Sequence, residues 1–147
     1  MFPTNILLAT DGSSSAAPAL RAAADLSAKT DSGVQVIYVG KGVPAPGTYN
    51  DPGQRDSEAS DKARGLLEEQ AKQIEELGGK VVNTKVVPGK KPAEEIVKLT
   101  RDEDIGLVVI GSRGLGRIRY AIQGSVSGTV VREAYRPVLV VHGDADV

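Results

Sequence analysis

Short apolar runs, each about as long as a strand, alternate along this chain with stretches that carry a helical pattern. We expect the strands at residues 5–9, 34–39, 80–87, 107–110 and 138–141. We expect the helices at residues 16–30, 56–77, 92–100 and 126–135. Strands and helices that alternate in this way form a parallel sheet with helices on both faces. The chain is therefore predicted to be an α/β protein built on an open parallel sheet of five strands.

The helix expected over residues 56–77 has the clearest pattern. Apolar residues recur there at spacings of three and four, namely Ala63, Leu67, Ala71, Ile74 and Leu77. The remaining face is charged and is expected to be exposed to solvent. Gly78-Gly79 is expected to end the helix.

Two other elements carry local signals. The helix over residues 16–30 follows the polar residues 10–15, whose side chains offer helix caps. The strand over residues 80–87 mixes valine with polar residues, which indicates an edge of the sheet rather than its centre.

A strand, a glycine loop and a helix start follow one another late in the chain. Gly111 and Gly114 come at the end of the fourth strand, and Gly124-Ser125 directly precede the helix expected from Val126. A helix start leaves backbone N–H groups unpaired and carries the positive end of the helix dipole, and glycine lets the backbone approach a ligand closely. Three arginines in the same segment favour a polyanion: Arg113, Arg117 and Arg119. We therefore predict a phosphate-binding loop; the alternative is that these glycines only form turns.

Ligands of open parallel sheets bind at the carboxyl ends of the strands, where the winding reverses. If the first and fourth strands are neighbours, Asp11 faces Gly111 across that edge. Asp11 could there accept a ribose hydroxyl or hold Mg²⁺ against phosphates. A role as a helix cap is equally compatible with its position. The proline- and glycine-rich segment over residues 40–55 is either a flap beside the site or an irregular crossing.

Composition excludes several classes of function. The chain has no cysteine, so disulfides, thiol catalysis and cysteine-ligated metals are excluded, and its only histidine, His142, cannot form a multi-histidine zinc site. The net charge of -1 gives no basic face for nucleic acid. Neither a signal peptide nor an apolar run of membrane-spanning length is present, so we expect a cytoplasmic protein without a membrane partner.

The sequence resembles the universal stress protein family over nearly the whole chain. The specific motif is G-x2-G-x9-G-[ST], met by Gly111, Gly114, Gly124 and Ser125. The opening run Ile6 to Ser13 and the closing Arg136-Pro137 with its valine-rich strand support the match. The resemblance implies one Rossmann-like domain over residues 1–147, with strand order 3-2-1-4-5. It also implies a homodimer formed through the last strand.

The resemblance also implies a role for individual residues. Members with the full glycine motif form the ATP-binding branch of the family. By similarity, Thr10 and Asp11 lie at the nucleotide, with Asp11 at the ribose or at Mg²⁺; Val39 contacts adenine through its backbone; Ile110 and Gly111 contact adenosine; and Gly114, Gly124, Ser125 and Val126 contact the phosphates. Arg113 stands at a variable position of the motif, so its role is inferred only from its charge. One departure is Gly128, where a stronger helix former is usual and which costs the helix about 1 kcal/mol relative to alanine.

These observations favour an ATP-binding stress-response or signalling protein that acts through nucleotide-dependent conformation. A slow ATPase or autophosphorylating enzyme is the first alternative. Residues 111–125 contain no Asp, Glu or His that could serve as a general base, which argues against fast catalysis. A nucleotide-independent dimeric interaction module is the second alternative. Cyclic AMP or another adenine nucleotide remains an alternative ligand, since a glycine motif that binds phosphate does not indicate how many phosphates the ligand carries.

Overall fold

The protein folds around a parallel sheet of five strands in the order β3-β2-β1-β4-β5. The computed structural model describes residues 2–12, 16–40, 55–88, 91–112 and 125–142. The strands are β1 (Asn5–Thr10), β2 (Gly33–Gly40), β3 (Lys80–Pro88), β4 (Leu107–Gly111) and β5 (Val138–Val141). The predicted fold class and strand order are therefore confirmed.

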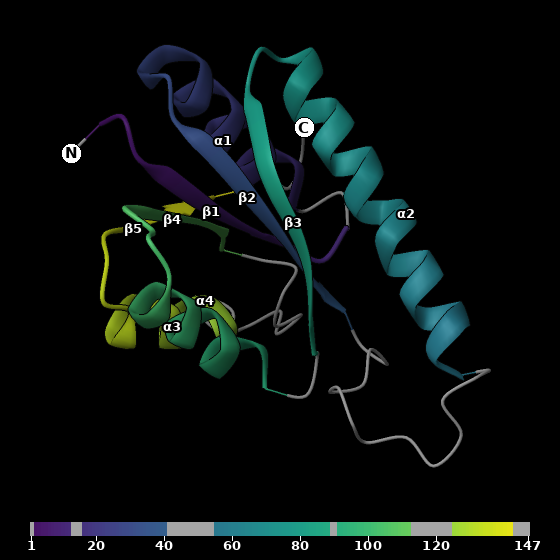
Figure 1. Cartoon of the computed structure of the whole chain (residues 1–147). Helices are drawn as coiled ribbons and strands as arrows, with labels where there is room; N and C mark the ends of the chain where they lie inside the picture. Colours follow the sequence, from purple (N-terminus) through teal and green to yellow (C-terminus); the bar gives the residue numbers. More distant parts are fainter. Residues whose placement is uncertain (1, 13–15, 41–54, 89–90, 113–124, 143–147) are drawn as a thin grey trace.

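Helices cover both faces of this sheet (Figure 1). One face packs against α1 (Ala17–Thr30) and α2 (Arg55–Glu76), and the other against α3 (Pro92–Asp102) and α4 (Ser125–Glu133). Each predicted helix and strand is present, with ends that differ from the expected ones by no more than two residues.

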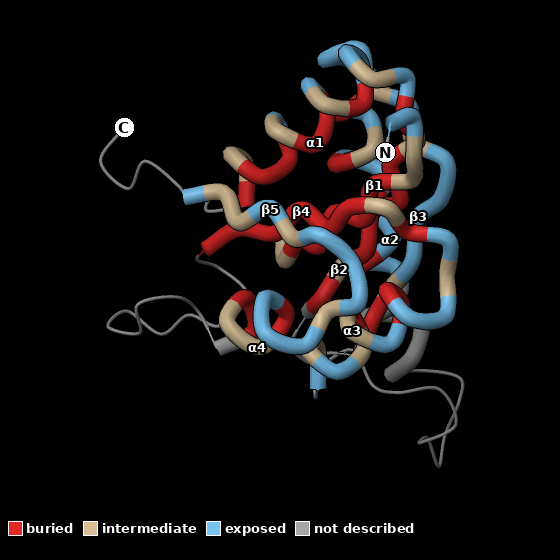
Figure 2. The backbone as a smooth tube through the Cα atoms, turned by 90° about the vertical axis from the view of Figure 1, so that its left-hand side faces the viewer, coloured by how far each residue is buried: buried red, intermediate tan, exposed pale blue. Residues whose placement is uncertain are grey.

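Successive residues of the central strands point into two different cores. In β1, Ile6 and Leu8 belong to the core under α1 and α2, whereas Leu7 and Ala9 belong to the core under α3 and α4. β1 and β4 are buried on both faces, as the continuous buried trace through the middle of the molecule shows (Figure 2). Each fully buried Leu or Ile stabilises the fold by about 1.5–3 kcal/mol relative to leaving it exposed. This burial is why unbroken apolar runs form the centre of the sheet.

The polar strand β3 lies at one edge of the sheet, as predicted. Val82 is 59% exposed, and Asn83, Thr84 and Lys85 are exposed as well. A mixed sequence is suited to an edge strand because only part of its surface is covered.

Two local predictions about helices are wrong. The N-cap of α1 is Ala16, whose methyl group cannot accept a hydrogen bond, so the described residues Thr10, Asp11 and Gly12 do not cap this helix. Leu77, predicted to belong to the apolar stripe of α2, is 50% exposed. It follows the last turn of α2, where the chain already turns away through Gly78 at φ 93°.

Candidate functional site

The winding of the sheet reverses between β1 and β4. The two strands pair in parallel from Ile6↔Leu107 to Ala9↔Ile110, so Thr10 and Gly111 leave the sheet side by side. The chain continues from β1 into α1 on one face and from β4 toward α4 on the other. Open parallel sheets bind their ligands at the carboxyl ends of the strands where the winding reverses in this way. The predicted neighbourhood of the first and fourth strands is confirmed.

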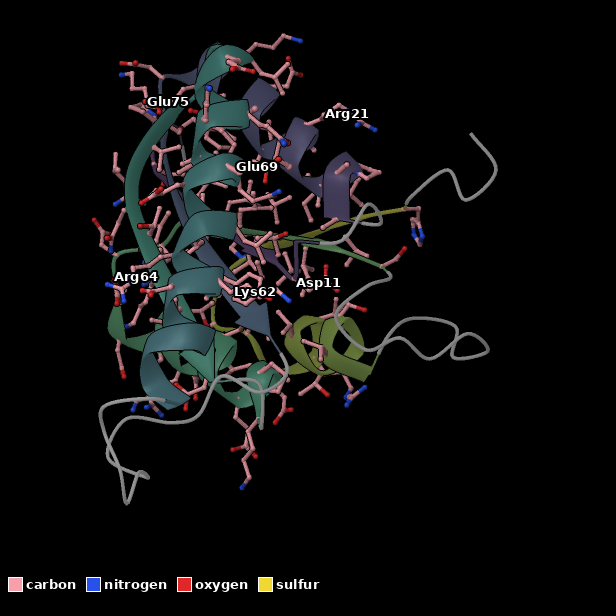
Figure 3. The ribbon with its side chains drawn as sticks, turned by 90° about the vertical axis from the view of Figure 1, so that its right-hand side faces the viewer. Asp11, Arg21, Lys62, Arg64, Glu69 and Glu75 are labelled. Atoms are coloured by element: carbon pink, nitrogen blue, oxygen red, sulfur yellow. The ribbon has the colours of Figure 1, made fainter. Side chains whose placement is uncertain are left out.

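Asp11 follows β1 directly at this edge and is partly exposed. Figure 3 shows it at the end of the strand, at the level of the middle turns of α2. The N–H of Gly12 donates to Thr10 Oγ1 at 3.0 Å, which closes a tight turn around Asp11. Because Ala16 is the N-cap of α1, Asp11 is not the N-cap residue of this helix, and its role as a ligand-binding carboxylate stays a prediction.

The Asp11 turn packs against two hydrophobic side chains. Gly12 has φ 78°, a conformation that glycine adopts easily, and its α-carbon faces the Leu66 methyl groups and the Tyr38 ring. Burial raises the pKa of the Tyr38 hydroxyl, and the negative charge of Asp11 raises it further. The Asp11 carboxylate therefore disfavours the ionised form of Tyr38.

Val39 and Ile110 reach the same edge on β2 and β4. Their side chains are 5% and 0% exposed and belong to the core under α3 and α4. Their backbone groups, rather than their side chains, are therefore what a ligand at this edge could contact. Gly111 is buried, and the following Ser112 is tied to β5 because its N–H donates to the Val141 carbonyl at 3.0 Å.

The helix α4 begins at Ser125, one residue before the predicted start at Val126. Since β4 and β5 are parallel, α4 runs back along the sheet and its N-terminus lies at the carboxyl edge of the strands. Val126 and Val130 anchor the helix, with 6% and 0% of their surface exposed in the core that α3 shares. The first N–H groups of α4 and the positive end of its dipole are thereby held at the edge that carries Asp11.

Several predicted site residues lie outside the described part of the chain, namely Arg113, Gly114 and Gly124, together with Arg117, Arg119 and residues 41–54 of the expected flap. The described residues therefore place Thr10, Asp11, Val39, Ile110, Gly111 and Val126, and the helical position of Ser125, at one edge. Their roles toward a ligand remain predictions.

Two residues at this edge escaped sequence analysis. Gln70 of α2 is 8% exposed and accepts a hydrogen bond from the Thr10 hydroxyl, and Tyr38 lies against Gly12. Gln70 could have been found, because it lies three residues after Leu67 and four before Ile74, on the apolar stripe of α2.

Within residues 2–12, 16–40, 55–88, 91–112 and 125–142, no three His, Cys, Asp or Glu side chains cluster to hold a metal ion. Asp11 suits Mg²⁺ in a different way, because Mg²⁺ binds commonly through one carboxylate and the phosphates of a nucleotide. Among the same described residues, no helix is long and apolar enough to cross a membrane.

A model described as the universal stress protein family matches residues 3–142. The chain belongs to the universal stress protein family. The universal stress protein MJ0531 of Methanocaldococcus jannaschii is 32% identical over 141 residues, which cover 92% of this chain and 80% of that protein. The match to MJ0577 of the same organism is 35% identical over 82 residues, so it spans 56% of this chain and about half, 49%, of that protein.

Solved structures of this family share the fold. The structure of MJ0577 superposes with a TM-score of 0.78 at 26% identity, covering 98% of this chain and 99% of that one. The universal stress protein of Archaeoglobus fulgidus in complex with dAMP superposes with a TM-score of 0.68 at 26% identity, covering 96% and 99% of the two chains. The resemblance inferred from the glycine motif is therefore confirmed at the level of family and fold.

Proposed function

We propose that this protein binds ATP or a related adenine nucleotide at the carboxyl ends of β1 and β4 and acts through the conformation that the nucleotide stabilises. One observation carries the proposal: the Asp11 turn and the N-terminus of α4 lie at the same edge, where the winding of the sheet reverses. The dAMP complex of the Archaeoglobus fulgidus relative supports it, because that family member holds an adenine nucleotide.

The two sides of this edge suit the two ends of a nucleotide. Phosphates would accept hydrogen bonds from the first N–H groups of α4 and from the glycine loop before it. Asp11 would accept a ribose hydroxyl or hold Mg²⁺ against the phosphates, and the backbone of Val39 would contact the base. Mg²⁺, when bound, would neutralise phosphate charge.

The experiment is calorimetric titration of the protein with ATP, with and without Mg²⁺, and with dAMP and cyclic AMP as comparison ligands. Asp11→Asn is expected to weaken ATP binding by about tenfold, because it removes a charge-assisted contact. Asp25→Asn is the matched control, since Asp25 lies on the exposed side of α1 and pairs with Lys29. If wild-type protein binds none of these nucleotides, the proposal is wrong.

We further propose that two copies pair through β5. This strand is the last of the sheet on the side opposite β3, and its Leu139 is 38% exposed. Val131 of α4 and Tyr135, which follows that helix, are exposed apolar side chains as well, at 47% and 60%. An apolar edge strand of this kind is a template for pairing with a second strand. Because α4 leads into β5, a nucleotide held at the start of α4 would act on the element that pairs the two copies.

Light scattering after size exclusion tests this pairing. Leu139→Lys is expected to give a monomer, because it places a charge in the apolar contact. Val82→Lys is the control, since Val82 is exposed on the opposite edge strand and its replacement is expected to leave the dimer intact. A wild-type monomer at high protein concentration would contradict the proposal. We also propose that the protein acts in the cytoplasm, which cell fractionation would test.

A further inference from the structure

A line of hydrogen bonds joins the Asp11 turn to the helix α2. The N–H of Gly12 donates to Thr10 Oγ1 at 3.0 Å, and the Thr10 hydroxyl donates to Gln70 Oε1 at 3.4 Å. Because the Thr10 oxygen already accepts from Gly12, its own hydrogen is available for Gln70. Asp11 lies between the two residues of the turn, so this line fixes the backbone on both sides of the carboxylate.

The two side chains of this hydrogen-bonded line, Thr10 and Gln70, are buried, which favours a single orientation of the Thr10 hydroxyl. Thr10 is 0% exposed and Gln70 is 8% exposed. A buried hydroxyl without a partner is unfavourable, so the hydroxyl of Thr10 is held in the rotamer that meets both Gly12 and Gln70. The Thr10 side chain is therefore committed to the protein, and only its backbone is available to a ligand.

Among residues 61–76 of α2, whose burial the structure describes, Gln70 is the polar exception on the inner side. Ala63, Leu67 and Ile74 are its buried neighbours on that side, with 1%, 3% and 0% of their surface exposed. Packing against the sheet alone would be served by an apolar side chain at this position, as it is at the other three. The Gln70 side chain instead accepts a hydrogen bond from the Thr10 hydroxyl, and Thr10 directly precedes Asp11, the predicted nucleotide contact. The need to hold Thr10 beside Asp11 explains why this position is polar.

We propose that Gln70 is a positioning residue for the nucleotide site, acting through the Thr10 hydroxyl on the orientation of Asp11. The inference rests on the proposed adenine-nucleotide site and adds to it a residue from a helix that itself has no predicted contact with the ligand. It also reassigns Thr10, whose side chain supports the site rather than touching the nucleotide.

The test combines nucleotide titration with variants that remove one hydrogen bond at nearly constant volume. Gln70→Met and Thr10→Val are expected to weaken ATP binding by about 3- to 10-fold, the equivalent of one lost hydrogen bond. Thr10→Ser keeps the hydroxyl and is expected to bind within about twofold of wild type. Gln73→Met is the matched control, because Gln73 is on the same helix and is only half-buried.

A purely structural role is separated from a positioning role by a double-mutant cycle. If Gln70 acts through Asp11, Gln70→Met has no further effect on ATP affinity in an Asp11→Asn background. Faster hydrogen exchange at the Gly12 amide of Gln70→Met, measured without ligand, is the expected accompanying sign that the turn has loosened.

The outcomes distinguish this inference from the proposed function. Wild-type protein that binds no nucleotide overturns the proposed function, and the role of Gln70 with it. Wild-type protein that binds ATP while Gln70→Met binds equally well overturns the role of Gln70 alone. An effect of Gln70→Met that persists in full in the Asp11→Asn background also overturns it, because the effect would not pass through Asp11.

Discussion

Replacing Gly128 by alanine is expected to stabilise the protein by about 1 kcal/mol, because Gly128 lies inside α4 and alanine is the better helix former. The structure leaves room for the change. A Cβ at this position would meet the Arg132 Nη1 atom at 3.6 Å, which is an ordinary van der Waals contact at the end of a flexible side chain. The full difference in helix propensity is therefore expected to appear, and the melting temperature is expected to rise by about 2–4 °C.

Thermal unfolding followed by circular dichroism measures this shift. Gly65→Ala is the matched control, because Gly65 lies inside α2 and a Cβ there would meet no other described segment of the chain within 4 Å. The two gains are expected to add, since they arise in separate helices. ATP affinity is expected to be unchanged by Gly65→Ala and no weaker in Gly128→Ala. A melting temperature that falls in Gly128→Ala while it rises in Gly65→Ala would refute the reasoning about α4.

Three further predictions concern the packing of the sheet and the Asp11 turn. Gly106→Ala is expected to destabilise the fold by about 1–3 kcal/mol in urea unfolding, because its Cβ would lie 2.8 Å from the Cβ of Thr4; an unchanged midpoint would contradict this. Ser27→Ala is expected to lower the free energy of unfolding by about 1–3 kcal/mol in the same assay, because the buried Ser27 hydroxyl donates to the Ser32 carbonyl before β2 and accepts from the Lys80 N–H at the start of β3. A loss below about 0.5 kcal/mol would argue against this bridge. Tyr38 is expected to ionise above its ordinary pKa in an absorbance titration, and Asp11→Asn to lower that pKa part of the way back, because burial remains. The raised pKa means that the folded state holds the Tyr38 proton more tightly than the unfolded state does. The free energy of unfolding is therefore expected to fall as the pH rises from about 10 through the folded pKa. Tyr38→Phe is expected not to show this loss. Equal alkaline sensitivity of wild type and Tyr38→Phe would contradict the role given to burial.

The sequence predicts elements better than it predicts their neighbours. The unbroken apolar runs of β1 and β4 identify strands because burial on both faces requires apolar side chains at successive positions. Nothing within a run states which other strand it will pair with. The order β3-β2-β1-β4-β5 was expected only through the resemblance to a family, and the parallel pairing of β1 with β4 then brought Asp11 to the site.

The residues that sequence analysis missed depend on contacts between distant segments. Gln70 is one polar residue in a helix with many, and only the approach of Thr10, 60 positions earlier in the chain, gives it a partner. Leu77 shows the opposite case, because an apolar residue in phase with the stripe is exposed once the helix has ended. Periodicity identifies the face of a helix, but where that face leaves the core depends on the length of the sheet beneath it.

The geometry of the proposed site explains how a bound nucleotide would affect the whole molecule. The Asp11 turn is held from the α2 side by Gln70 and Tyr38, whereas the start of α4 is anchored by Val126 in the opposite layer. Among the described residues, the strands of the sheet join these two sides, and β1 is paired with β4 at this edge. A nucleotide that contacted both sides would add a further connection between the layers. Since such a ligand binds the folded state alone, it would stabilise the fold by about 2.7 kcal/mol at a concentration 100 times its Kd. That stabilisation would depend on both anchors at once, so loosening either the Asp11 turn or the start of α4 would reduce it.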